Sequence, residues 1–462
     1  MRTFRPYEPD QILLLPPSLQ DWLPEGHLAR FVSDVVDELD LSAIYEEYEQ
    51  GDGRGYPPYH PVMMTKLVVY GYCTGRFSSR QIERLTYEDV GFRCLAADQH
   101  PDHDTVAFFR ERHLGALSGL FLQVLRLCRE AGLVKLGHVA VDGTKVLANA
   151  SKHKAMSYDR MEKDEKRLEE EIAKLLEQAR QVDQEENERY GKGVRGDELP
   201  AELARRESRL VKIREAKRAL EEGARQEAEA VNARIQEREE ADRRAGRRRR
   251  GRKPKRRDVA RARPEPKAQR NFTDPESRIM KDGSTKGFVQ AYNAQVGVDE
   301  KTGVIVAADV VQESNDKKQL KPMLLQVKKN LGRLPKRSSA DSGYFSGEAI
   351  EDEDLKKTDL YVATRRHKHN QKEPIEEVLP PDAEVSVTEQ MRNKLRTQEG
   401  RAIYARRKCI VEPVIGNIKE VQRFRRFSLR GHRKVRGEFL LVCMAHDLLK
   451  LFRGKRTAAV PA

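Results

Sequence analysis

Three acidic residues stand in local sequences that suit phosphodiester chemistry. They are Asp142 in GHVAVDGTK, Asp341 in SSADSGYFSG and Glu412 in CIVEPVIGNIKE. This chemistry needs carboxylates that converge from distant parts of a chain to hold divalent metal. Carboxylate oxygens are the ligands that Mg²⁺ prefers, and Mn²⁺ accepts the same hard donors. The three residues therefore predict a site for two Mg²⁺ ions, with Mn²⁺ as the alternative.

The two aspartates are each predicted at the end of a buried strand. Asp142 closes an apolar run that alternates from residue 138, and Asp341 follows the short run 336–340 and precedes the turn former Gly343. A carboxylate in that position is costly unless a metal or a partner compensates it. Taken alone, however, an aspartate before glycine or serine is more often a turn residue or a helix cap.

The order of the motifs resembles that of an insertion-sequence transposase of the DDE class. The resemblance covers nearly the whole chain and rests on YHPVMMTKLVVYGYCTGRFSSRQIERLTYEDVGFRCLA, VDGTKVLANAS, KGFVQAYNAQVGVD, VVQESNDKKQL, ADSGYFS and VEPVIGNIKE. It implies an enzyme with a ribonuclease H-like catalytic domain that cleaves phosphodiesters at the ends of its element and transfers the strands to target DNA. It also implies that Asp142, Asp341 and Glu412 are both the catalytic residues and the metal ligands.

The segment around Glu412 departs by one residue from the pattern of this family. That pattern is Tyr, two residues, Arg, three residues, Glu, six residues, Lys. Lys419 keeps its spacing from Glu412, and Tyr404 keeps its spacing from Arg407, but four residues separate Arg407 from Glu412 and Lys408 takes the place of arginine. The resemblance implies that Arg407 or Lys408, together with Lys419, contacts phosphate and that Tyr404 stacks on an unpaired base. A solvated lysine and a buried tyrosine are the alternatives.

The charge of the chain favours a polyanionic partner such as double-stranded DNA. There are 88 Lys and Arg residues against 74 Asp and Glu residues, a net charge of +14. The segment 241–270 alone holds 15 basic and 3 acidic residues, including Arg248 and Arg249. Contact with the DNA backbone is expected there, although a solvated charge run is the usual alternative. Arg423 and Arg426 extend the basic surface beyond Lys419.

Composition and periodicity predict an α/β chain made of several parts. Periodicity favours an all-α domain first, then a mixed α/β part that is interrupted by a helical hairpin or coiled coil. The resemblance implies that the mixed sheet of this catalytic part is of the ribonuclease H-like class. The predicted boundaries are 1–134 for the helical domain, 135–150 and 271–454 for the catalytic domain, 151–240 for the insertion and 241–270 for a basic linker.

The helical domain is the predicted place of a helix-turn-helix. Residues 59–113 favour short helices joined by turns, one of them capped by Thr105. Arg110 and Arg112 would then touch DNA. An ordinary helical bundle is the alternative.

Within the catalytic part, 287–298 and 303–311 predict a hairpin of the sheet, and the apolar spacing from Leu320 to Val327 predicts a helix that covers it. Asn315 and Asp316 follow the hairpin and are expected to face the metals.

Cysteine use and hydropathy indicate an intracellular protein. The five cysteines are scattered and odd in number, which favours reduced thiols. The N-terminus lacks an apolar segment like that of a signal peptide, and no run approaches about 18 apolar residues. The resemblance implies a bacterial, cytoplasmic, nucleoid-associated protein that acts as a dimer on its terminal inverted repeats and target DNA, away from membranes.

Two other functions are compatible with these patterns. One is a nuclease on the same fold that cuts DNA without strand transfer. The other is a DNA-binding protein that descends from a transposase and has lost catalysis. The presence of all three carboxylates with Tyr404 and Lys419 favours an active enzyme.

Overall fold

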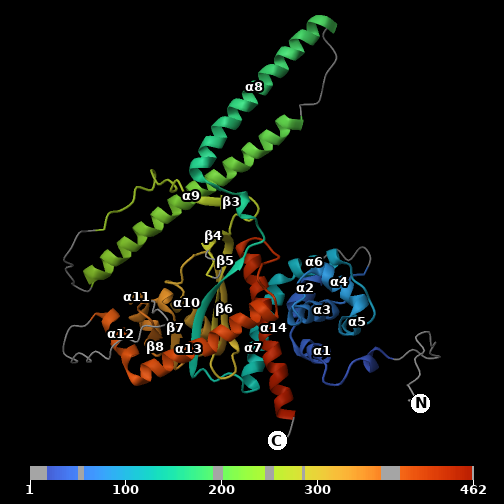
Figure 1. Ribbon diagram of the computed structural model, residues 1–462, viewed down its shortest axis with the longest axis vertical. Coiled ribbons are helices and arrows are strands. Elements are labelled where there is room, and N and C mark those ends of the chain that lie inside the picture. The colour runs from blue at the N-terminus through green and yellow to red at the C-terminus, as the bar shows by residue number, and fades with distance from the viewer. Residues whose placement is uncertain are drawn as a thin grey trace, which may run out of the picture. The chain divides into compact units, whose positions relative to one another are not determined.

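The structure is a computed structural model that describes residues 18–49, 57–190, 201–244, 254–283, 287–365 and 386–459 (Figure 1). The chain divides into two compact units. Unit 1 comprises Met1–Val146 and Asn293–Ala462, and unit 2 comprises Leu147–Tyr292. The mixed α/β class is as predicted. This division does not separate residues 1–134 from the predicted catalytic part, and it assigns 271–292 to unit 2.

The N-terminal region of unit 1 is helical. Helix α3 lies at its centre, because almost every one of its side chains is buried. Asp102, not Thr105, caps α6 by accepting a hydrogen bond from the Thr105 backbone N–H at 2.6 Å. The helices are α1 (Leu28–Glu38), α2 (Ser42–Glu49), α3 (Pro61–Cys73), α4 (Ser79–Glu88), α5 (Val90–Leu95), α6 (His103–Arg112) and α7 (Leu114–Glu130).

The sheet is mixed, with antiparallel pairing on one side and parallel pairing on the other. The strand order is β4-β5-β1-β7-β8, where β4 is Arg278–Lys281, with β6 also paired to β5. Strands β5 and β6 form the antiparallel hairpin predicted at 287–311, whereas β1, β7 and β8 are parallel. The strands are β1 (His138–Leu147), β5 (Phe288–Asp299), β6 (Ile305–Val311), β7 (Arg337–Ala340) and β8 (Asp359–Val362).

Strand β1 is longer than the sequence predicted. Its first four residues are buried, as a central strand covered on both faces requires. Asp142 was expected at the strand end, but β1 continues through Leu147 and places it mid-strand. The Asp-Gly pair therefore makes no turn here. Asp341, in contrast, follows β7 directly, as predicted.

Three helices complete the framework around this sheet. The predicted covering helix is α10 (Leu320–Leu331), which packs on β6, and α13 (Gln398–Gly416) packs on β7 and β8. The C-terminal α14 (His432–Ala459) packs on α7, α3 and β6 (Figure 1). Its buried Asp447 accepts a hydrogen bond from the Ile305 backbone N–H at 2.8 Å. Smaller helices are α11 (Gly347–Ile350) and α12 (Val387–Arg396).

Unit 2 contains the two long helices predicted for the insertion. They are α8 (Tyr158–Tyr190) and α9 (Ala201–Arg244), and the reversal predicted at 191–200 lies outside the described residues. The short strands β2 (Ala155–Ser157) and β3 (Gln269–Asn271) pair antiparallel beside them. Strand β4 (Arg278–Lys281) pairs antiparallel with the first residues of β5.

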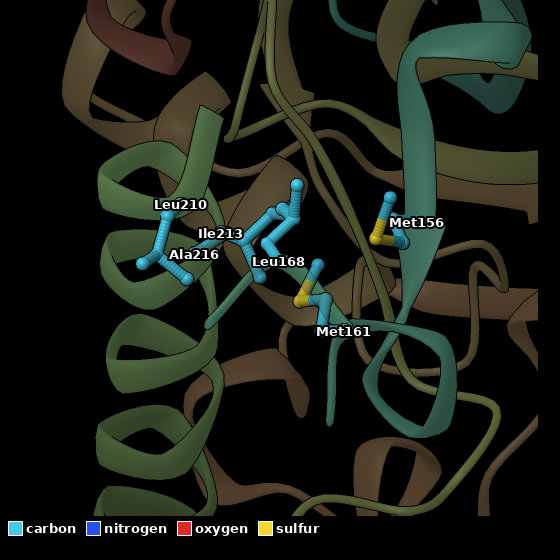
Figure 2. Packing of buried hydrophobic residues seen from close by; sticks show 6 residues of the cluster. All are labelled: Met156, Met161, Leu168, Leu210, Ile213 and Ala216. Atoms are coloured by element: carbon cyan, nitrogen blue, oxygen red, sulfur yellow. The ribbon is translucent and has the colours of Figure 1, made fainter. Parts of the chain in front are cut away.

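An apolar cluster and a row of ion pairs join the two long helices. Figure 2 shows Met161 and Leu168 of α8 beside Ile213 of α9; Met156, Leu210 and Ala216 complete the cluster. Arg206 pairs with Glu171 at 3.1 Å and Arg214 pairs with Glu165 at 3.0 Å. Because partners later in α9 lie earlier in α8, the helices run antiparallel. Leu176, which belongs to the predicted apolar stripe, is exposed.

Gly75→Ala is expected to lower the unfolding midpoint of the protein. Gly75 has a φ of +71°, and an added Cβ would lie 2.7 Å from the carbonyl oxygen of Gln422. The left-handed conformation alone costs a side chain about 1–2 kcal/mol, and the backbone contact adds to that cost. The matched control is Gly119→Ala in α7, where a Cβ meets nothing within 4 Å and helix propensity favours alanine by roughly 0.5–1 kcal/mol. The measurement is the free energy of unfolding of both variants from urea denaturation. Equal values for Gly75→Ala and Gly119→Ala would contradict the structure.

Candidate functional site

Asp142 and Asp341 lie side by side because they follow paired positions of two neighbouring parallel strands. In the pairing of β1 with β7, Val141 is the partner of Ala340. The next residue of each chain segment is an aspartate, and neighbouring strands lie only about 4.8 Å apart. The charge of Asp341 is felt at Asp142, whose pKa it raises. The structure thus brings together two of the three predicted carboxylates.

The charge of Asp142 is met by one arginine. Arg407 donates from Nη1 to Oδ2 of Asp142 at 2.9 Å, and the Gly143 backbone N–H donates to Oδ1 at 2.8 Å. Burial raises the pKa of Asp142 to about 6, while Arg407 acts in the opposite direction. Removing one member of such a pair leaves an uncompensated, mostly buried charge. The ion pair therefore keeps a carboxylate in a position where it would otherwise be costly.

Arg407 and Lys408 differ in what they can reach. The Arg407 side chain is only 10% exposed, and its guanidinium carbon lies 5.9 Å from the centre of the Tyr404 ring. Burial raises the pKa of Tyr404. Lys408 is exposed and has no ion-pair partner in the part of the chain that the structure describes. Of the two residues that the sequence left as alternatives, Arg407 is engaged with a carboxylate and Lys408 is accessible to a phosphate.

Glu412 lies on α13 but is not assembled with the two aspartates. It follows Arg407 by five residues, which is about 140° around a helix of 3.6 residues per turn, and it is exposed to solvent. Within the described ranges, no three His, Cys, Asp or Glu side chains form a group that could hold a metal ion. The one-residue departure of the motif is thus visible as a change of helix face.

A third carboxylate, that of Asp316, approaches Gly143 of β1 from the loop after β6. Its Oδ1 accepts hydrogen bonds from Asn293 Nδ2 and Gln295 Nε2, each at 2.7 Å. Both amides come from β5, the neighbour of β1. A Cβ at Gly143 would lie 2.8 Å from this oxygen. The sequence predicts Asp316 near the metals only because this residue follows a strand. No local pattern in the sequence indicates that Asn293 and Gln295 donate hydrogen bonds to it.

Lys145 and Tyr344 connect Asp316 to the two aspartates. Lys145 Nζ lies 4.0 Å from Asp316 Oδ1, and Tyr344 donates its hydroxyl to Gln295 Oε1. Burial lowers the pKa of Lys145, whereas Asp316, Asp341 and Asp142 act to raise it. Burial and the same three carboxylates raise the pKa of Tyr344. Three carboxylates therefore share one electrostatic environment. Their oxygen donors fit Mg²⁺ or Mn²⁺ in kind.

The basic residues beyond α13 divide into paired and accessible ones. Lys419 lies in the π-helical turn Asn417–Val421 and donates from Nζ to the Lys145 carbonyl at 3.0 Å. Arg425 pairs with Glu420. Arg423 and Arg426 are exposed and have no ion-pair partner among the described residues.

The remaining predicted DNA contacts lie elsewhere. Arg110 is 6% exposed and donates to the Phe77 carbonyl at 2.6 Å, so its guanidinium supports the helical fold. Arg112 donates to the Glu47 carbonyl at 2.8 Å. Arg248 and Arg249 lie outside the described residues.

Two family models match this chain. One, described as Transposase DDE domain, matches residues 263–448, and the other, Transposase domain (DUF772), matches residues 17–112. The first range contains Asp341 and Glu412 but begins after Asp142. No curated protein and no solved structure matches the chain. Among the described residues, no helix has the length and apolar character needed to span a membrane.

Gly143→Ala is expected to disrupt the carboxylate network while the protein remains folded. The new Cβ would meet Asp316 Oδ1 and the Gln295 amide at less than van der Waals distance, so Asp316 and Gln295 must move away from residue 143. We expect phosphodiester cleavage to fall by roughly 10- to 100-fold, the cost of disturbing groups that orient a metal site. Gly137→Ala is the control, because a Cβ there meets nothing within 4 Å. The measurement is cleavage of labelled duplex DNA by both variants. Equal activity of the two would show that the site tolerates a side chain at position 143.

Proposed function

Because the chain belongs to the insertion-sequence transposases of the DDE class, we propose that it binds the ends of its insertion sequence, cleaves the DNA there and joins those ends to a target. The observation that carries this proposal is the juxtaposition of Asp142 and Asp341 at the meeting of β1 and β7. Two carboxylates at neighbouring parallel strands, supported by a third at Asp316, make an oxygen-rich site. The sheet order supports a ribonuclease H-like catalytic domain.

In this proposal Asp142, Asp341 and Glu412 hold two divalent metal ions, Mg²⁺ or Mn²⁺. When bound, such ions stabilise the attacking and leaving oxygens of a phosphodiester. Glu412 is exposed on α13, so its part in the site depends on a change of its position when DNA and metal bind. Apo geometry alone does not exclude such a candidate.

The neighbouring residues position the DNA. Lys408 and Lys419 contact backbone phosphates, and Tyr404 stacks on an unpaired base near the cut. Arg407 orients Asp142, which it contacts at 2.9 Å. Further backbone contacts come from Arg423 and Arg426 and from the basic segment 241–270.

The proposal extends to the setting of the reaction. The partners are double-stranded DNA, namely the terminal inverted repeats and the target, and a second copy of the chain in a dimer. The protein works in the bacterial cytoplasm, at the nucleoid.

The decisive experiment compares Asp142→Asn, Asp341→Asn and Glu412→Gln with the unaltered protein. Each removes one negative charge with little change of shape, so we expect cleavage and strand transfer to fall by more than the roughly 10- to 100-fold that orienting residues cost. DNA binding should persist. The measurement is cutting and joining of labelled duplexes that carry the DNA flanking the gene, with Mg²⁺ and with Mn²⁺.

Glu420→Gln serves as the matched control. Glu420 is an exposed acidic residue that follows Glu412 closely in the sequence, and it pairs with Arg425. Cutting without joining would identify a nuclease instead. Binding without cutting under either metal would identify a non-catalytic DNA-binding protein. Full activity of Glu412→Gln would remove Glu412 from the site.

Asp316→Asn separates a positioning role from a structural one. Asparagine keeps an oxygen that can accept from Asn293 and Gln295, but it removes the negative charge that acts on Lys145 and Tyr344. We expect the Mg²⁺ concentration for half-maximal cleavage to rise by roughly 10- to 100-fold, with an unchanged unfolding midpoint. An unchanged metal requirement would show that Asp316 acts only on the fold.

A further inference from the structure

Unit 2 contains a cavity of about 510 Å³ between the segment before α8, the start of α8, one face of α9 and the residues after β3. Its floor includes Met156 and Ile213, which belong to the apolar cluster in Figure 2. Among the described residues that line it, none is acidic. Six are basic or can become so: His153, Lys154, Arg160, Arg205, Arg209 and Lys212. We call this feature the basic cavity.

Helix α9 contributes a regular polar stripe to the basic cavity. Arg205, Ser208, Arg209 and Lys212 have the spacing i, i+3, i+4 and i+7, which places them on one face of a helix. At a rise of 1.5 Å per residue, the stripe is about 10.5 Å long. The remaining basic residues face it from the segment 153–160.

The cations of the basic cavity differ from the cations that join α9 to α8. Arg206, Arg214 and Lys217 of α9 each pair with a glutamate of α8 at 2.9–3.1 Å. Among the described residues, in contrast, Lys154, Arg160, Arg205 and Lys212 have no ion-pair partner, and Arg209 lies 3.5 Å from Asp164. The ion pairs of the hairpin thus engage Arg206, Arg214 and Lys217, whereas most cations of the basic cavity have no carboxylate partner among the described residues.

We infer that the basic cavity binds the phosphate backbone of duplex DNA, as a contact separate from the carboxylate site. The identity of the polyanion rests on the proposed function, which makes DNA the substrate. One strand of B-DNA carries a phosphate every 3.4 Å of helix axis, so a stripe of about 10.5 Å spans roughly three phosphates. Arginine side chains and a serine hydroxyl are suitable donors to phosphate oxygens.

The test is the salt dependence of DNA binding by the full chain. The cavity variant carries Arg160→Ala, Arg205→Ala and Lys212→Ala. The matched control carries Arg218→Ala, Arg225→Ala and Arg234→Ala, which remove the same charge from exposed positions of α9 outside the basic cavity. Affinity for a labelled duplex is measured by fluorescence anisotropy between about 50 and 200 mM salt.

The cavity variant should lose about 3 units from the slope of log K against log salt, because each phosphate contact contributes about 0.9. The control should keep the slope of the unaltered protein, and both should keep its helix content and unfolding midpoint. Equal slope losses in the two variants would overturn the inference, because net charge alone would then explain binding. An unchanged slope in the cavity variant would also overturn the inference. A loss of slope that is seen only with single-stranded DNA would do so as well.

The salt dependence of DNA binding can be measured without catalysis by introducing the same substitutions into the Asp142→Asn protein. A protein that cuts and joins DNA but keeps its slope in the cavity variant would refute the basic cavity alone. A protein that loses the slope but does not cut or join DNA would refute the proposed reaction alone.

Discussion

The ion pair between Asp142 and Arg407 is the interaction on which the arrangement of unit 1 depends. Asp142 lies within a central strand, where burial raises its pKa to about 6, and its charge would be costly without a cation close by. Arg407 supplies that cation at 2.9 Å from α13. The pair therefore fixes α13 against β1, and with it the positions of Tyr404 on one side of Arg407 and Lys408 on the other. A cation that enters between the aspartates would compete with this guanidinium.

The carboxylates of Asp142, Asp316 and Asp341 have room beside the backbone because Gly143 and Gly343 carry no side chain. Gly143 leaves room for Asp316 Oδ1 and for the Gln295 amide, and Gly343 donates its backbone N–H to Asp341 Oδ1 at 2.8 Å. The amides of β5 then hold Asp316 in place without neutralising it. Neutral donors of this kind fix the orientation of a carboxylate and leave its charge available, which is what a metal ligand or its neighbour needs.

The sequence predicted the features that local patterns determine. Alternation between 287 and 311 located the β5–β6 hairpin, the spacing of Leu320, Met323, Leu324 and Val327 located the buried face of α10, and Asp341 follows its strand as expected. It did not predict features that depend on distant partners. Asp142 lies mid-strand because β1 runs on to Leu147, Arg110 is buried against the Phe77 carbonyl, and the helix face of Glu412 depends on how α13 is anchored by Arg407. The first two outcomes have no local signal in the sequence, whereas the five-residue step from Arg407 to Glu412 is visible in the sequence but gains its meaning only from the contact of Arg407 with Asp142.

The net charge of +14 has a different meaning in different parts of the structure. Arg407, Arg214 and Lys217 face carboxylates within their own unit, so they stabilise the fold and offer little to a partner. Lys408, Arg426 and the cations of the basic cavity have no such partner among the described residues, apart from Arg209 with Asp164. Self-repulsion among unpaired cations disfavours a compact state, and phosphate binding relieves it. The distribution of pairing, more than the total charge, therefore indicates which cations are available for the proposed contacts with DNA.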